Sequence, residues 1–352
     1  MVDTLSPLGV ETDMAEPSPL RVLHLVGSPE TDFYSELSKL YAREVITPEG
    51  VSATYAIVEP DGSWHLTDSL DAPGPALNFR AAMAALPSVD LVVPHLFCPR
   101  GMTEFRDLFE VRLGLPLVGS TGDVCAVATD KAATKAVLES AGLHTPDSVT
   151  VLDGDPVPSL DMPVIVKPNS EDNSVGVSLV REPSGLGDAI QSALAHDSHV
   201  LVEAFIPGRE IRLCVVEGKD GPFVPAIMEY PLDPKCPIRQ VDDKLDVGSD
   251  GLPVSQARKH SAHAVCPAPL SDDLKARLEA AALRAHAALG ARHYSLFDLR
   301  VREGNAAIYF LEAGLFWAFS EISMISRMLA ADGRDVPGAI GELWRSAAMV
   351  KA

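Results

Sequence analysis

The chain has 352 residues, of which 47% are hydrophobic and 22% charged, which is typical of a folded globular protein and too apolar for a disordered one. It carries 29 Lys and Arg against 49 Asp and Glu, so its net charge is −20 and we expect no general binding to nucleic acid or to an anionic membrane. At about 150 residues per domain, the length predicts two or three domains.

The cysteines and the N-terminus indicate a cytoplasmic protein. The five cysteines are odd in number and scattered, with no C-x-x-C spacing, which favours buried thiols over a disulfide framework or a zinc site. Residues 1–19 are acidic and contain proline, without the apolar centre of a signal peptide, so we predict a disordered tail. No apolar run approaches the roughly 18 residues that span a bilayer.

Residues 20–119 alternate buried strands with helical stretches. A short apolar run that ends in Gly27 and Ser28 is typical of a parallel strand entering a loop. The pattern therefore predicts an N-terminal open parallel α/β domain. We place its strands at 21–28, 54–59, 90–97 and 115–120, and a helix at 103–113.

The rest of the chain divides into a central segment, 120–204, and a C-terminal α+β segment, 205–352. A helix over 129–143 opens the central segment, with Thr129 or Asp130 as its cap and Gly142 at its end. We predict further strands at 148–152, 162–168, 175–180, 199–205, 210–218 and 223–230, a long helix at 271–289, a hairpin at 294–313 and a final pair of helices.

Lys167 ends an apolar run, where an ammonium group is costly to bury without an anionic partner. The small polar loop after it, in VIVKPNSEDNSVGVSLV (164–180), could lay backbone N–H groups along phosphates. A plain polar hairpin with a solvated lysine is the alternative. The stretch is no Walker A loop, and no G-x-G-x-x-G follows a strand.

For four other charged residues, exposure to solvent is the alternative to a role in ligand binding. Glu203 and Glu210 flank a Pro-Gly turn and could hold an adenine amino group and a ribose hydroxyl, or be solvated turn residues. Lys131 in a first helical turn and Lys259 in a polar stretch could equally be solvated lysines.

Two carboxylates face each other in the predicted hairpin. Asp298 and Glu312 are equidistant from the turn at 304–305, so they should lie almost opposite on one face. Like charges directly across a strand pair are destabilising and need a cation. Two hard carboxylates with open positions suit Mg²⁺ that carries substrate phosphates. An edge pair facing water, or pairing with Arg300, is the alternative.

These motifs, in their order, resemble the D-alanine–D-alanine ligase branch of the ATP-grasp superfamily. The resemblance extends over about residues 20–345 and rests on the ordered set, because each motif alone is weak. It is carried by TDKAATKAVLESAGLHTP, VIVKPNSEDNSVGVSLV, EAFIPGREI, a lysine before CPAPLS, the D-x13-E hairpin, and PHLF and LGLPLVGS in the first domain.

The resemblance implies a three-domain ATP-grasp fold, with ATP between the central and C-terminal parts. It implies phosphate contacts by Lys131 and Lys167 and a nucleotide-covering loop with Ser174. The remaining implied ATP and metal residues are Glu203 and Glu210, backbone groups of Ala204 and Ile206, Lys259 on a closing loop, and Asp298 and Glu312 as ligands of one or two Mg²⁺, with Mn²⁺ as a substitute.

The sequence departs from the family pattern around the substrates. The family's Glu–Ser–Tyr triad for the first substrate is replaced by Phe33, Asn173 and His260, its second-metal Asn by Gly314, and the arginine two residues before the metal aspartate by Leu296. Arg300, two residues after that aspartate, is the candidate catalytic arginine, beside Lys259 and Ser174. Other candidate substrate residues are His95, Phe316, Trp317 and Ser323.

We therefore expect an ATP-dependent carboxylate–amine ligase that acts through an acyl phosphate and joins two amino-acid-like molecules other than two D-alanines, as in secondary metabolism. The alternatives are a degenerate nucleotide-binding protein and an enzyme of intramolecular cyclisation. Small-molecule carboxylate and amine substrates and a homodimer are the expected partners.

Overall fold

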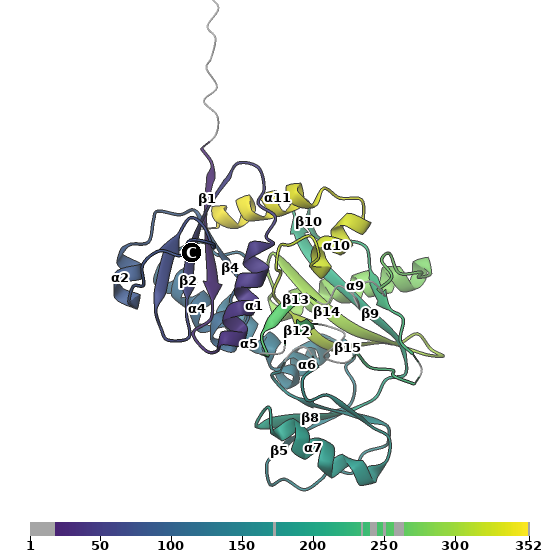
Figure 1. The fold of residues 1–352 in the computed structure, drawn as a ribbon. Coiled ribbons are helices and arrows are strands. Elements are labelled where there is room, and N and C mark those ends of the chain that lie inside the picture. Colours follow the sequence, from purple (N-terminus) through teal and green to yellow (C-terminus); the bar gives the residue numbers. More distant parts are fainter. Residues whose placement is uncertain are drawn as a thin grey trace, which may run out of the picture.

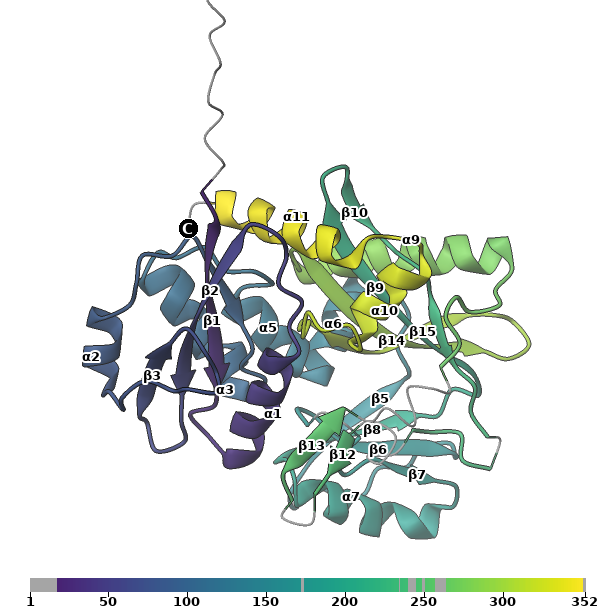
Figure 2. The ribbon, with the colours of Figure 1, turned by 45° about the horizontal axis from the view of Figure 1, so that its top comes forward.

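The computed structural model describes residues 18–171, 174–233, 235–239, 245–248, 251–256 and 264–350. Three sheets, each with its own helices, make up most of this part of the chain, and Figures 1 and 2 show them as three packed units. The predicted mixed α/β class is confirmed.

The N-terminal sheet has the order β3-β2-β1-β4. Its strands are β1 (Leu20–Gly27), β2 (Val51–Val58), β3 (Trp64–Thr67) and β4 (Leu91–Pro94). The first strand is parallel to both of its neighbours, whereas β3 is antiparallel to β2 and was not predicted. Its helices are α1 (Asp32–Arg43), α2 (Phe79–Ala84), α3 (Pro99–Met102), α4 (Glu104–Asp107) and a π-helical turn, η1 (Leu108–Arg112).

The predicted strand at 115–120 is wrong. Only Leu117 of this segment pairs with the sheet. It forms an isolated β-bridge to Val92 of β4, with two backbone hydrogen bonds of 2.8 and 3.0 Å. The chain then leaves the sheet at Gly119, which has a positive φ of 95°. A left-handed residue at this point ends the extended pairing.

The central sheet is antiparallel, with the order β5-β8-β6-β7, and α7 (Leu186–Leu194) packs on one of its faces. Its strands are β5 (Ser148–Leu152), β6 (Val164–Pro168), β7 (Ser178–Val180) and β8 (His199–Ala204), with a 3-10 turn, η2, at Pro183–Gly185. This unit projects at the bottom of Figure 1.

The C-terminal sheet has the order β10-β9-β14-β15, with β11 also paired to β9. Its strands are β9 (Gly208–Gly218), β10 (Gly221–Phe223), β11 (Met228–Tyr230), β14 (Tyr294–Arg302) and β15 (Ile308–Gly314). The single strand predicted over 223–230 is broken in two, because Pro225 lies between the two pieces and has no N–H for the ladder. A two-stranded sheet joins β12 (Leu245–Val247) to β13 (Pro253–Gln256).

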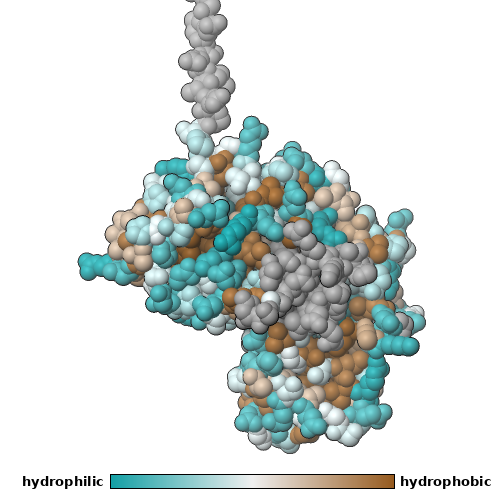
Figure 3. Space-filling model, viewed as in Figure 1, coloured by the Kyte–Doolittle hydropathy of each residue, from teal (hydrophilic) through white to brown (hydrophobic). Residues whose placement is uncertain are grey.

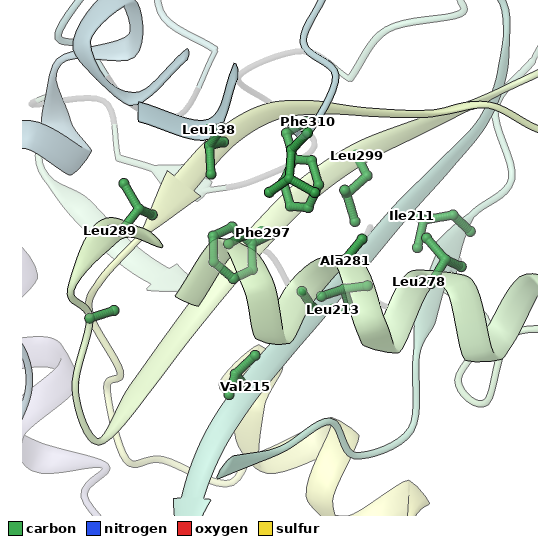
Figure 4. Close-up of a cluster of buried hydrophobic side chains, with 14 of the residues drawn as sticks. Leu138, Ile211, Leu213, Val215, Leu278, Ala281, Leu289, Phe297, Leu299 and Phe310 are labelled. Atoms are coloured by element: carbon green, nitrogen blue, oxygen red, sulfur yellow. The ribbon is translucent and has the colours of Figure 1, made fainter. Parts of the chain in front are cut away.

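Helices cover this sheet and link it to the N-terminal unit. They are α5 (Gly122–Thr129), α6 (Lys131–Ser140), α9 (Asp272–Leu289), α10 (Met324–Ala331) and α11 (Val336–Met349). Ser271 caps α9 by accepting from the Leu274 N–H at 3.3 Å, and Gly290 ends it in the left-handed region. Figure 4 shows α9 packed over Phe297 and Leu213 of the sheet.

Two packing details bear on the domain organisation. Leu138 of α6 belongs to the same core as the C-terminal sheet, although we predicted its segment within the central unit, 120–204. Trp344 of α11 belongs to a core with Val22 and Leu91 of the N-terminal sheet, and Figure 2 shows α11 reaching toward that sheet. The domain boundaries stay a prediction. Among the described residues, no helix is long and apolar enough to cross a membrane.

Candidate functional site

A cavity between the central and C-terminal sheets gathers most of the residues singled out in the sequence. Its empty volume is about 760 Å³, open solvent included. The predicted residues that line it are Lys131, Lys167, Ser174, Glu203, Ala204, Ile206, Glu210, Asp298, Arg300 and Glu312. In Figure 3, hydrophobic surface gathers on the lower unit, below the residues drawn in grey.

Lys167 has the anionic partner that its buried position requires. It leaves β6 beside Glu203 of β8, and the Nζ–Oε1 distance is 2.7 Å. Lys135 of α6 approaches the other carboxylate oxygen at 2.9 Å, and all three side chains are buried. Burial alone raises the pKa of Glu203, but the two lysines outweigh it and hold that pKa below its usual value.

Lys135 was missed in the sequence. Its position one helical turn after Lys131 could have revealed it, because residues four apart share a helix face. Burial, more than any neighbour, lowers the pKa of Lys135. The predicted contact of Glu203 with adenine stays a prediction, and this carboxylate already accepts from two ammonium groups.

Lys131 opens α6 and points into the loop that follows β6. Its Nζ donates to the carbonyl oxygens of Asn169 and Glu171, at 3.3 and 2.5 Å. Asp130 caps the helix by accepting from the Ala133 N–H at 2.8 Å, as predicted. A freely solvated Lys131 is therefore wrong, because this side chain is buried against the loop.

The loop itself is only partly described. Ser174 has a positive φ of 63° and lines the cavity. Asn173, Lys259 and His260, which were also predicted to lie in the site, are outside the described residues.

The hairpin carboxylates lie opposite each other, as predicted. Asp298 of β14 is in register with Glu312 of β15 and with Arg212 of β9. The guanidinium of Arg212 donates to both oxygens of Asp298, at 2.5 Å each, and Arg239 adds a contact of 3.3 Å. An arginine from the neighbouring strand therefore supplies a positive charge beside the paired carboxylates, and their ligation of a metal ion stays a prediction.

Arg300 does not pair with the hairpin carboxylates, which corrects one alternative. Its Nη2 lies 3.0 Å from Oε2 of Glu210, and Arg239 binds the other oxygen of this glutamate. Burial and the neighbouring Arg239 together lower the pKa of Arg300 more than Glu210 raises it. The other alternative, an edge pair facing water, is also wrong for Asp298, which is only 5% exposed.

Arg212 and Arg239 were both missed. Arg212 stands two residues after Glu210 on one strand, so the period-2 alternation could have placed both on the same face. Arg239 follows a proline-containing polar stretch that gives no signal in the sequence.

The donor set at the hairpin fits a divalent ion that also binds phosphate. Asp298 and Glu312 offer carboxylate oxygens from adjacent strands, which is the chemistry that Mg²⁺ prefers when it keeps waters and phosphate oxygens as further ligands. Within the described part of the chain, no group of three or more His, Cys, Asp and Glu could hold a metal ion. Oxygens of waters or of a bound phosphate would complete the shell of an ion held by the two carboxylates.

The candidate substrate residues are divided between core and surface. The Trp317 indole donates to the hydroxyls of Ser323 and Ser326, at 3.0 and 3.1 Å, and its ring stacks on Phe319 with centroids 4.6 Å apart. Trp317 and Ser323 are buried, so the structure does not support direct contact of the indole with a substrate.

Half-buried aromatic rings form a row at the junction with the N-terminal unit. Phe316 packs edge-on against Phe97 with centroids 5.4 Å apart, and Phe97 against Tyr41 of α1 at 4.8 Å. Phe33 lies earlier on the same helix and is also half-buried. Phe97 and Tyr41 were not singled out in the sequence, because their contact depends on how the units pack.

His95 is buried inside the N-terminal unit. Its Nε2 lies 2.9 Å from Nδ1 of His24 on the neighbouring strand. Burial lowers the pKa of His24 to about 4 and that of His95 well below its usual value. Both rings are buried and neutral, as is typical of histidines in a protein core, and contact of His95 with a substrate stays a prediction.

Known proteins resemble the chain in sequence and in structure. Residues 147–344 match a family model described as D-ala D-ala ligase C-terminus. The D-alanine–D-alanine ligase of Chlorobium limicola is 31% identical over 269 residues, which cover 73% of this chain and 68% of that protein. The D-alanine–D-alanine ligase of Mycolicibacterium gilvum is 29% identical over 328 residues, 83% of this chain and 87% of that protein.

Solved structures share the fold. The VanG D-Ala:D-Ser ligase from Enterococcus faecalis has a TM-score of 0.73 at 21% identity, covering 94% of this chain and 99% of its own. The D-alanine-D-alanine ligase from Coxiella burnetii has a TM-score of 0.72 at 19% identity, covering 94% of each chain. At these identities the likeness establishes the ATP-grasp architecture.

Proposed function

The chain belongs to the D-alanine–D-alanine ligase family, and on that premise we propose that it joins two amino-acid-like molecules other than two D-alanines. The family resemblance expected from the motifs is confirmed, and the chain is an ATP-dependent carboxylate–amine ligase of this type. The observation that carries the ligase assignment is that Lys131 and Lys167 line the same cavity as the hairpin carboxylates.

The cavity's cations would bind the ATP phosphates. Lys131 and Lys167 approach from one side, and Asp298 and Glu312 would hold Mg²⁺, or Mn²⁺ in its place, on the other. The metal, when bound, would neutralise charge on the transferring phosphoryl group. Glu203 orients Lys167 through their ion pair, so the ammonium group is fixed before the nucleotide arrives.

The proposed reaction has two displacements. An oxygen of the first substrate's carboxylate attacks the γ-phosphorus of ATP, the bond to ADP breaks, and an acyl phosphate forms. The amine of the second substrate then attacks the acyl carbon, loses a proton, and expels inorganic phosphate. Loops that carry Ser174 and Lys259 would cover the site and exclude water, which would otherwise hydrolyse the acyl phosphate.

The aromatic row supports a substrate with an apolar side chain. Phe316 and Phe97 are half-buried where the N-terminal and C-terminal units meet. Aromatic rings at a binding surface contribute large apolar contact area. D-alanyl-D-alanine synthesis is the second candidate, which the names of the relatives favour. We also propose that the enzyme is a homodimer with the domain limits given above.

Replacement of the hairpin carboxylates tests the metal site. Asp298→Asn and Glu312→Gln should each lower ATP turnover at least about 100-fold, because the loss of metal coordination removes several kcal/mol of transition-state stabilisation. The matched control is Asp153→Asn, an exposed aspartate of the central unit, which should keep full turnover. Full turnover in both hairpin variants would contradict the proposed site.

A substrate screen tests the specificity. Phosphate release is measured with Mg²⁺ and ATP against pairs of D- and L-amino acids, β- and γ-amino acids and simple carboxylates, with mass analysis of positive wells. We expect release that needs two added compounds and yields a condensed product. D-alanyl-D-alanine as the preferred product would overturn the proposed specificity and leave the ligase assignment intact.

A further inference from the structure

A cation already lies at the hairpin carboxylates. Arg212 stands directly opposite Asp298 on paired antiparallel strands, where side chains of paired residues share a face. Its Nε and Nη2 each lie 2.5 Å from one oxygen of Asp298. The planar guanidinium matches the two oxygens of a carboxylate, so this contact is set by the strand register.

The surroundings hold this pair in place. Its side chains are 15% and 6% exposed, and Arg239 contacts Oδ2 of Asp298 at 3.3 Å. The Arg239 guanidinium lies 4.0 Å over the Tyr230 ring, which also faces Arg212 at 5.6 Å. An arginine side chain keeps its positive charge at any physiological pH.

The same contacts limit how a metal ion can coordinate Asp298. Each oxygen of Asp298 already accepts an N–H bond, while divalent Mg²⁺ and Mn²⁺ need oxygen ligands. Glu312 faces Asp298, but Gly314, two residues later on the same face, has no side-chain donor. The Phe316 ring lies 3.8 Å from where a Cβ of residue 314 would be.

We infer that Arg212 neutralises Asp298 in place of a second divalent ion. The nucleotide complex then binds a single Mg²⁺ or Mn²⁺, held by Glu312, by Asp298 and by the phosphates. This inference rests on the proposed function, because it assumes ATP in the cavity. Arg212 is thus a positioning residue, which sets how many metal ions the site takes.

Metal stoichiometry tests the inference without turnover. The full chain is titrated with Mn²⁺ with and without a non-hydrolysable ATP analogue, and free Mn²⁺ is followed by electron paramagnetic resonance. The reported number is the Mn²⁺ bound with the analogue minus the Mn²⁺ bound without it, so that ions on the acidic surface are not counted. We expect one Mn²⁺ per complex in the natural chain and in Gly314→Asn, and two in the double variant Gly314→Asn/Arg212→Gln. In the double variant residue 314 offers an amide oxygen, and no guanidinium holds the Asp298 carboxylate.

Two further variants complete the test. Arg212→Lys keeps the charge and should still bind one Mn²⁺. Arg209→Gln removes another β9 arginine, paired with Glu229 away from the cavity, and should also bind one. Two Mn²⁺ in the natural chain or in Gly314→Asn, or one in a folded Gly314→Asn/Arg212→Gln, would overturn the inference. If the double variant does not fold, the counts for the natural chain and for Gly314→Asn decide. A chain that binds no analogue would instead contradict the proposed function itself, and the inference with it.

Discussion

At the level of single residues, the positions of the charged side chains in the cavity depend mainly on the pairing of buried charges. Glu203 is 2% exposed and lies between two buried lysines, a position that is stable only because both carboxylate oxygens are paired. Lys167 was recognised in the sequence because an ammonium group that ends an apolar strand must have a partner. Which acid would be that partner depended on the pairing of β6 with β8.

Removal of the Glu203 charge should destabilise the central unit. Glu203→Gln leaves two buried ammonium groups without a counter-charge, and we expect a loss of about 3 kcal/mol in the free energy of unfolding, measured in urea. Glu104→Gln breaks an exposed pair with Arg100 and should cost under about 0.5 kcal/mol. Equal losses in the two variants would show that burial of the triad does not matter.

The buried histidines predict an acid-dependent loss of stability. The pKa of His24 is about 4 in the folded chain against about 6.5 when unfolded, so between these values the unfolded state binds more protons. The free energy of unfolding should keep its full value above about pH 6.5 and decrease as the pH drops toward 4. Protonation of His24 should account for about 3 kcal/mol of this decrease.

His24→Leu should reduce this pH dependence, measured by urea unfolding at pH 7 and pH 4.5, while the buried His95 and His293 keep the rest of it. His199→Gln, a change at an exposed histidine, is the matched control and should retain the full dependence. The same slope in His24→Leu as in the natural chain would contradict the assignment.

At the scale of elements, the site depends on how closely β9 and β14 approach. Gly208 begins β9 with a positive φ of 137°, and a Cβ there would lie 2.1 Å from the Val301 carbonyl oxygen. Glycine at this position therefore lets the strands pair from Gly208 onward. That pairing brings Glu210 and Arg212 beside Arg300 and Asp298.

Gly208→Ala should therefore destabilise by about 3 kcal/mol, from backbone strain and overpacking together. Gly154 also has a positive φ, of 85°, but no atom lies within 4 Å of its Cβ position, so Gly154→Ala isolates the backbone term at about 1 kcal/mol. Thermal and urea unfolding compare the two. A smaller loss at Gly208 than at Gly154 would refute the close-approach argument.

At the scale of the whole molecule, the cavity joins two units that have separate cores. Its lining comes from β6 and β8 on one side and from β9, β14 and β15 on the other. A ligand in it contacts both, so binding should stabilise them together. The C-terminal helix α11 ties the third unit to this body through Trp344.

Nucleotide should therefore stabilise the folded chain in a metal-dependent way. ADP with Mg²⁺ at about 100 times its dissociation constant should add about 2.7 kcal/mol to the free energy of unfolding. Removal of the metal with EDTA should reduce this gain, because the phosphates then lose a neutralising charge. Thermal unfolding measures the gain, and AMP is the control nucleotide. An identical gain with and without Mg²⁺ would contradict the metal site.

The sequence by itself determined the fold class, the helices α6 and α9, the hairpin of β14 and β15, and the pairing of Asp298 with Glu312. It could do so because strand alternation, helix caps and turn residues are local signals, and a hairpin's register follows from its turn. The order of the motifs was enough to indicate the family. Local signals failed where pairing is non-local, as in the single bridge at Leu117 and the short strand β3.

Only the tertiary structure decided which charges meet. Arg212 is 86 residues from Asp298, and Lys135 is 68 from Glu203, so no local pattern relates the members of either pair. The burial of Trp317 and the row from Tyr41 to Phe316 likewise arise from the packing of separate units. Charges and rings from distant segments meet only when sheets and helices pack, and these contacts decide what the site can bind.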